Sequence, residues 1–208
     1  MKIGDIKIEA LRLMFALIEG NMTAETLTDY EQSDTVGDYL AAMPGSINRA
    51  LADITSRRIL PEKSHVLTLA DGQRLISAYR FDLSQIEDFY DVSRVIAETH
   101  NGYDGNHPFR MEGRTLVLLA PDDSATFTLL YYPKLDPVGA WDNTHDLDIP
   151  DEIASVIPYF LKGEIYREDE IGDAAEAMSW YEQRLAALDP HRTEKQDRVV
   201  STYSQVLL

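Results

Sequence analysis

The chain has no cysteine among its 208 residues. This absence excludes disulfide bonds, cysteine-liganded zinc and thiol catalysis, and it fits a reducing cytoplasm. No apolar run approaches the roughly 20 residues that a membrane-spanning helix needs. The first 20 residues are apolar only at intervals and carry charges at Asp5, Lys7, Glu9 and Arg12. We therefore expect no secretory signal and no membrane segment.

Basic residues are scarce as well. Lysine and arginine number 19 against 36 aspartates and glutamates, which gives a formal net charge of −17. Such a surface is repelled by the phosphates of free DNA, so general nucleic-acid binding is not expected. Solubility is the simplest reading of the acidity. The proportions of hydrophobic residues (44%) and charged residues (26%) are ordinary for a soluble globular protein.

The sequence also lacks the short motifs of common active sites. It contains no GxxxxGK[ST] or GxGxxG phosphate loop, no GxSxG and no HExxH. No two histidines are paired at helical spacing; they are His65, His100, His107, His145 and His191. We predict no catalytic, cofactor-binding or metal-binding residue, and no enzyme activity.

Several clusters have simpler interpretations than chemistry. The loop WDNTHDLD offers the oxygen ligands Asp142, Asn143, Asp146 and Asp148, but it lacks the glycine and terminal glutamate of an EF-hand. The segment between His100 and His107, which includes Asp104, resembles a surface turn more than a metal site. The acids Glu164, Glu168, Asp169 and Glu170 fit a solvated helix end. Of the adjacent tyrosines Tyr131 and Tyr132, we expect one in the core and one at its rim, and we expect Trp141 and Trp180 to be core or interface residues.

Residues 1–60 are predicted to form two helices. In the first, Ile8, Leu11, Phe15 and Ile18 recur at helical spacing, and Gly20 is the expected stop. The second places Ile47, Ala50, Leu51, Ile54 and Arg58 on one face. Pro44 and Gly45 precede that face, so this helix either restarts there or kinks.

Residues 61–135 change to short runs rich in Val, Ile, Phe, Tyr and Thr, which favour strands. The dipeptide Asp71-Gly72 between two such runs predicts a β-hairpin. About five or six strands follow one another with no helix between them. This order predicts an antiparallel sheet, sandwich or barrel and argues against a parallel, doubly wound sheet.

Residues 136–190 are predicted to form a helical hairpin. The first helix begins near Pro150 and carries the apolar stripe Ile153, Ile157, Phe160, Leu161 and Ile165. The second carries a packing seam at Ala174, Met178, Tyr181, Leu185 and Leu188, and Asp189-Pro190 ends it. Small residues would let the two helices approach closely; they are Gly163, Ala174, Ala175 and Ala177. The predicted fold is therefore α+β: a bundle of four main helices, two N-terminal and two C-terminal, with an inserted antiparallel β-sheet or sandwich domain.

Residues 191–208 form an arm that is first polar and then apolar. Its end, VVSTYSQVLL, is strand-like, and it either folds back on the chain's own sheet or pairs with another subunit by strand addition. We take the following as candidate partner-binding residues: Val199, Val200, Tyr203, Val206, Leu207 and Leu208.

The stretch from Tyr131 to Leu188 resembles the C-terminal half of the head-to-tail connector proteins of tailed bacteriophages and prophages, also called adaptor or head-completion proteins. The matching features are a strand ending in Tyr-Pro, an Ile-Pro helix start, an acidic break and a Tyr-Glu pair followed by leucine. They lie at Tyr132-Pro133, Ile149-Pro150, Ile157-Pro158-Tyr159, Asp169, Tyr181-Glu182 and Leu185. The helix INRALADI is similar to the one that precedes the β part in such proteins.

The resemblance implies a virion structural protein at the head–tail junction, made in the cytoplasm of the bacterial host. Its partners would be the portal protein and tail or stopper proteins. It would self-associate into a ring, twelvefold in the family, and the resemblance is compatible with monomers that the portal templates. DNA would only pass through the channel, and an acidic lining would let it slide because like charges repel.

Other functions fit part of the pattern. The chain could be another tail-completion or capsid-associated virion protein, which shares most of these features. A β-sandwich module that binds a carbohydrate or small ligand would need a deep pocket with several polar groups. An enzyme would need His, Asp or Glu side chains that converge in one cleft, and the sequence offers no such set.

Overall fold

The computed structural model describes residues 1–15, 22–30, 32–33, 36–98, 104–119, 121, 126–139 and 142–188. The chain divides into two compact units. A helical unit combines Met1–Ile59 with the chain from Pro137 onward, and a β unit comprises Leu60–Asp136. The predicted arm at 191–208, with its six candidate residues, lies outside the described residues, as do Ile18, Gly20, His100, Trp141 and Asp189-Pro190.

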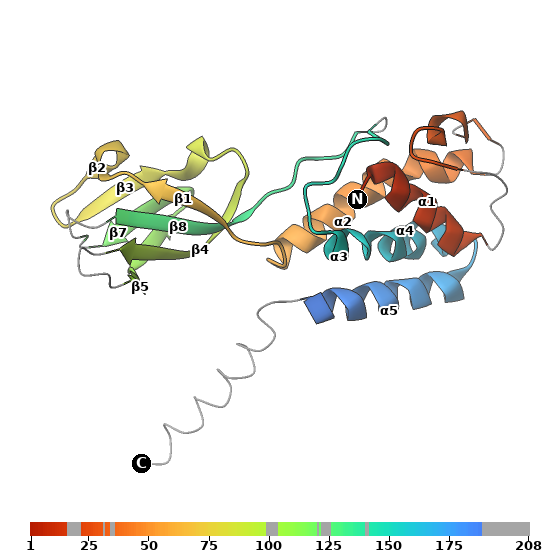
Figure 1. Cartoon of the computed structure of the whole chain (residues 1–208). Helices are drawn as coiled ribbons and strands as arrows, with labels where there is room; N and C mark the ends of the chain where they lie inside the picture. Colours follow the sequence, from red (N-terminus) through yellow and green to blue (C-terminus); the bar gives the residue numbers. More distant parts are fainter. Residues whose placement is uncertain are drawn as a thin grey trace, which may run out of the picture. The chain divides into compact units, whose positions relative to one another are not determined.

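The helical unit has four main helices, two before and two after the β unit, which confirms the predicted bundle (Figure 1). They are α1 (Ile3–Met14), α2 (Gly37–Ser56), α4 (Ile157–Ile165) and α5 (Ile171–Leu188), and short segments are α3 (Asp151–Ala154), η1 (Leu27–Tyr30) and η4 (Tyr166–Glu168). The helix α4 is central, since it packs against α1, α2 and α5. The core side chains that meet there are completely buried and include Ile6, Leu11, Met43, Ile47, Ile157 and Leu161.

The first helix is shorter than the sequence predicted, because α1 ends at Met14 rather than near Gly20. Phe15 is extended, with φ −121° and ψ 122°. Its ring packs edge-on against Tyr39, at 5.1 Å between centroids, and against Tyr166, at 5.9 Å. The Lys162 ammonium also donates to the Leu13 carbonyl at 2.8 Å, which satisfies one of the last free carbonyls of α1. Contacts with distant parts of the chain therefore end α1 before the stop that the local sequence predicts.

The second helix runs without interruption through Pro44, so of the two alternatives, a restart or a kink, the restart does not occur. Proline has no N–H to donate, which removes one backbone hydrogen bond from the helix. The apolar face compensates, because Met43, Ile47 and Ile54 are completely buried and each contributes about 1.5–3 kcal/mol of burial free energy. Arg58 does not continue this face, since α2 ends at Ser56 and Arg58 is exposed with φ of 57°.

The β unit contains two antiparallel sheets of four strands. One has the order β1-β8-β4-β5 and the other the order β2-β3-β7-β6. The strands are β1 (Lys63–Leu67), β2 (Gln73–Arg74), β3 (Ala78–Asp82), β4 (Phe89–Glu98), β5 (Asp104–Asn106), β6 (Phe109–Glu112), β7 (Thr115–Leu119) and β8 (Thr126–Pro133). Figure 1 shows the β unit in colours from orange-gold at β1 to green at β8.

The hairpin expected at Asp71-Gly72 does not form. The strand before it, β1, pairs with β8 in one sheet, and the strand after it, β2, pairs with β3 in the other. Asp71 instead ends a short 3₁₀ turn, Leu69–Asp71. The ring of Phe81 lies so close to Gly72 that a Cβ there would meet it at 2.8 Å. Gly72 therefore allows Phe81 to pack closely at the point where the chain passes from one sheet to the other.

Apolar side chains from both sheets fill the interior of the β unit. The cluster consists of Leu67, Tyr79, Phe81, Leu83, Phe89, Val95, Leu116, Leu118, Phe127, Leu129 and Tyr131. Most of its strand members alternate with outward-facing residues, as the two-residue period of a strand requires. This arrangement confirms an antiparallel sandwich. Because the interior is filled with apolar groups, it offers no room there for the polar pocket of a ligand-binding module.

The C-terminal helices differ from the predicted hairpin at one point. The helix expected from Pro150 to Ile165 is split into α3 and α4, and Pro158 lies in the first turn of α4, where its missing N–H costs nothing. Gly163 lets α5 approach, because a Cβ there would lie 3.0 Å from Met178 Cε and 3.2 Å from the Ala174 carbonyl oxygen. Ala174, Ala177, Tyr181 and Leu185 form the buried face of α5, close to the predicted seam.

Candidate interaction surfaces

A polar clamp fixes one face of α5 to the end of α2. The Tyr181 hydroxyl donates to Asp53 Oδ2 at 2.8 Å, and the Arg57 guanidinium donates to Asp53 Oδ1 at 3.1 Å. Arg57 also forms a two-pronged pair with Glu182, at 2.6 and 2.7 Å. Burial, followed by the hydrogen bond to Asp53, raises the pKa of Tyr181, so this phenol stays protonated and remains a donor. The clamp determines which side of α5 faces outward.

The outward side of α5 carries an acidic and aromatic patch, which we call the α5 patch: Asp173, Glu176 and Trp180. Spacings of three and four place these residues on one face of the helix. Trp180 is 46% exposed, and its indole N–H donates to Glu176 Oε1 at 3.3 Å. Asp173 is 62% exposed and lies 3.5 Å from the Lys162 ammonium. Trp180, predicted to be a core or interface residue, therefore lies partly exposed at the surface and not in the core.

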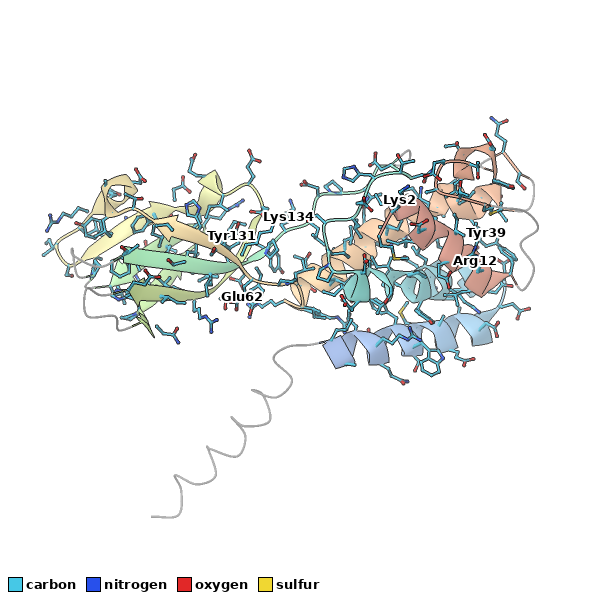
Figure 2. The ribbon with its side chains drawn as sticks, viewed as in Figure 1. Lys2, Arg12, Tyr39, Glu62, Tyr131 and Lys134 are labelled. Carbon is cyan, nitrogen blue, oxygen red and sulfur yellow. The ribbon has the colours of Figure 1, made fainter. Side chains whose placement is uncertain are left out.

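A groove of about 450 Å³ lies among α1, α4, α5 and the Met22 segment. Its apolar part is formed by Ile8, Met22, Pro158 and Tyr159, and its polar part by Asp5, Glu9, Arg12, Ser155 and Arg184, with Met1 at one side. Arg12, labelled in Figure 2, pairs with Glu9 at 3.4 Å, and Arg184 lies over the Tyr159 ring at 4.5 Å. The groove therefore has a partly apolar lining with charged side chains of both signs around it.

A second hollow, of about 680 Å³, lies at the tip of the β2–β3 hairpin. It is lined by Arg74, Leu75, Ile76, Ser77, Ala78, Arg110 and Leu119. Ile76 is fully exposed, the most exposed large hydrophobic side chain of the described residues. We call Arg74, Ile76 and Arg110 the hairpin tip. Arg110 pairs with Glu112 at 2.7 Å, and Arg74 lies over the Tyr79 ring at 5.8 Å.

The acidic loop WDNTHDLD has a structural role in the helical unit. Asn143 is buried, and its side-chain oxygen accepts from the Lys7 ammonium at 2.7 Å. Its carbonyl accepts from Gly4 N–H at 2.8 Å, and Asp142 accepts from Gly139 N–H at 2.6 Å. These contacts tie the loop to the start of α1. Within the described residues no three His, Asp or Glu side chains are grouped closely enough to hold a metal ion.

The other polar candidates are also held by neighbours or lie exposed. Glu164 pairs with Arg49, and Asp169 accepts from the Tyr39 hydroxyl at 2.6 Å, a bond that raises the pKa of Tyr39 to about 12 (Figure 2). Glu168 and Glu170 are exposed. One ring nitrogen of His107 lies 2.9 Å from the Leu119 carbonyl oxygen, whereas His65 and His145 are exposed.

The two adjacent tyrosines are both buried, each 5% exposed, so the expected rim position is wrong. Tyr131 belongs to the sandwich core and donates to Asp88 at 2.8 Å (Figure 2). Tyr132, on the opposite face of β8, lies with its hydroxyl 3.5 Å from Glu62. Neither ring forms an exposed stacking platform.

Sequence reasoning missed the hairpin tip. Ile76 was counted only as part of a strand-like run, whereas it lies in a turn between β2 and β3. The available signal was the spacing: RLISAYRF contains apolar Leu75 and Ile76 side by side, which no alternating strand can bury on one face.

A family model described as SU10 adaptor protein matches residues 1–205, almost the entire chain. No curated protein matches the chain significantly. In the described residues, no helix has both the length and the apolar character needed to cross a membrane.

Proposed function

Because the chain belongs to the SU10 adaptor family, a family of phage head–tail adaptor proteins, we propose that it docks as a ring beneath the portal and joins head to tail. Membership makes it a phage adaptor and a structural protein of the virion. The observation that carries the proposal is the extent of the match, which spans residues 1–205 and so includes both units.

The architecture of the helical unit supports a role in assembly. The helix α5 is held by its buried seam and by the Asp53–Tyr181 and Arg57–Glu182 contacts. Trp180, on the flank of α5 beside this seam, is 46% exposed. A rigid helix with one packed face and one exposed aromatic face is suited to present a fixed surface to another protein, and tryptophan is enriched among residues that dominate binding.

The charge supports passage of DNA through the proposed ring. A net charge of −17 on each copy would make a ring strongly negative, and like charges keep a translocating duplex from adhering to the wall. Acids such as Glu168 and Glu170 are exposed and available for such a surface. A ring structure with basic residues lining the channel would contradict this part of the proposal.

The C-terminal arm is the proposed contact with a portal, tail or stopper protein. Its apolar end contains Val199, Val200, Tyr203, Val206, Leu207 and Leu208 within ten residues. Strand-like segments of this kind bind by adding to the edge of a partner's sheet, where main-chain hydrogen bonds supply affinity.

Sedimentation tests the function directly. The isolated chain is compared by analytical ultracentrifugation with a mixture of the chain and the portal protein encoded beside it. We expect co-sedimentation as a large complex of fixed stoichiometry, and the chain truncated after Arg198 is expected to lose most of this binding. If the full chain sediments independently of the portal, the proposed docking is wrong. If the truncated chain binds as well as the full chain, only the role of the arm is wrong.

A further inference from the structure

The strand β1 is an edge of its sheet. It pairs with β8 on one side, and no strand among the described residues pairs with its other side. It has five residues, whereas the other edge strands, β2, β5 and β6, have two, three and four. Proteins usually keep edge strands very short or cover them, because an open edge is a template for pairing with another segment. Of the described edges, β1 is therefore the one most open to a further strand.

An apolar side chain of β1 is left largely exposed. Val66 is 58% exposed, although it begins a row that continues across the sheet to Thr128 and Ile96. Thr128 and Ile96 are only partly exposed, and each has a strand on both sides. A strand added beside β1 would place a side chain next to Val66 and extend this row. The edge thus offers an added strand both main-chain hydrogen bonds and an apolar contact.

The arm of the same chain, residues 191–208, has the composition of such a strand. Its last ten residues, VVSTYSQVLL, contain no charged side chain, no proline and no glycine, and half of them are Val, Thr or Tyr, which favour strands. The arm as a whole has three bases and two acids, a net charge of +1, so the remaining residues carry −18. This charge repels other acidic segments and weakly attracts the arm. The arm is therefore the segment of this chain best suited to the edge.

The tether favours a chain's own arm over the arm of a second copy. Ten residues, 189–198, separate the end of α5 from Val199. Fully extended, ten residues span at most about 33–36 Å. A short tether holds a binding segment at an effective concentration of about 1 mM. At micromolar protein concentration, the arm of a second copy is therefore at a disadvantage of about a thousandfold.

We propose that residues 199–208 of the free chain add to the open edge of its own β1, and that binding of the portal protein releases them. This inference rests on the proposed function, in which the same arm binds a partner by strand addition. One segment cannot pair with both edges at once, so the two contacts compete. Docking on β1 covers Val66 and keeps the apolar end of the arm from other copies before assembly.

Hydrogen exchange measured by mass spectrometry tests the docking. The full chain is compared with the chain truncated after Arg198. We expect peptides that contain β1 to exchange about tenfold faster in the truncated chain, because alternate N–H groups of β1 lose their hydrogen bonds to the arm. Peptides from β3 and β7, in the other sheet, should exchange equally in both chains. Equal exchange of β1 in the two chains would overturn the inference.

A pair of prolines in the arm distinguishes strand addition from less specific cover. The double substitution Ser201→Pro and Thr202→Pro removes two consecutive N–H groups. Consecutive N–H groups of a strand point to opposite edges, so one of the two faces β1 in either register. We expect this variant to exchange β1 as fast as the truncated chain does. The control, Ser201→Ala with Thr202→Ala, keeps both N–H groups and should match the full chain. Slow exchange of β1 in the proline variant would contradict strand addition.

Dilution distinguishes the chain's own arm from the arm of a second copy. For contact within one chain, β1 should exchange at the same rate when the protein is diluted about a hundredfold, because the effective concentration of a tethered segment does not change. Protection of β1 that disappears on dilution would mean that the arm of a second copy is bound, and would overturn the inference.

The portal protein tests the release. In the complex that sediments with the portal, we expect β1 to exchange as fast as in the truncated chain, and protection as slow as in the free chain would contradict the release. Portal binding by a chain whose arm never protects β1 would leave the proposed function intact and overturn this inference. Protection of β1 by the arm without any portal binding would support the docking and contradict the proposed function, and with it the release.

Discussion

At the scale of single residues, Tyr181 illustrates how one side chain serves both packing and polarity. It is fully buried, its ring packs against Phe160 at 5.1 Å, and its hydroxyl donates to Asp53. In Tyr181→Phe the packing stays, and Asp53 keeps Arg57 as a donor. We expect a loss of about 1 kcal/mol in the free energy of unfolding, the usual contribution of one hydrogen bond. Urea denaturation followed by tryptophan fluorescence measures it.

Tyr90→Phe is the matched control for this change, because Tyr90 is 43% exposed. Its effect should stay within about 0.5 kcal/mol, as is usual for surface substitutions. Equal effects of the two substitutions would mean that the bond to Asp53 does not stabilise the helical unit.

Contacts of this kind could mostly not be predicted from the sequence, because the residues that meet are far apart in the chain. The helical period correctly placed Tyr181 on the buried face of α5, but Asp53 is far away in the sequence, and no spacing pairs the two. The same holds for Lys7 and Asn143, which meet because the loop before α3 returns to the start of α1. The spacing in the oxygen-rich loop shows that it lacks an EF-hand pattern, but its structural role depends on this distant lysine.

At the scale of elements, the approach of α4 and α5 depends on Gly163. A valine there would place new atoms within about 3 Å of Met178 and of the Ala174 carbonyl, so Gly163→Val is expected to destabilise the chain by about 1–3 kcal/mol through overpacking. Gly172→Val is the control, since no atom lies within 4 Å of a Cβ at that position of α5. When thermal unfolding is followed by circular dichroism, we expect a lower midpoint temperature for Gly163→Val and an unchanged one for Gly172→Val. Similar midpoints would show that the helices separate at little cost.

Element types were predicted well from periodicity, and element ends were not. The stripes of α2 and α5 and the runs of β4 and β8 are long enough to specify helix or strand locally. The end of α1 was wrong because the Phe15–Tyr39–Tyr166 ring cluster acts across the fold. The Asp71-Gly72 hairpin was wrong because β1 forms five residue pairs with β8, whereas its neighbour β2 has only two residues to offer.

At the scale of the whole molecule, the change in composition near residue 60 reflects a change of core. The β unit buries its own eleven-residue cluster, with members from both sheets. The helical unit buries a separate set around α4. Sequence alone indicated helices flanking a β-rich segment, but the number of sheets follows from strand pairing, which depends on contacts between residues far apart in the chain.

Separate cores predict separate responses to a core mutation. Leu116 is fully buried on β7, and Leu116→Ala should cost about 2–5 kcal/mol from lost burial and the cavity left behind. Hydrogen exchange measured by mass spectrometry should show lost protection in peptides from β3, β7 and β8, whereas peptides from α2 and α5 keep theirs. Val66→Ala, at a position 58% exposed in the same unit, should change neither set. Equal loss of protection in both units would mean that the two units unfold together in one cooperative step. In that case the β unit could not unfold locally during assembly while the helical unit stays folded.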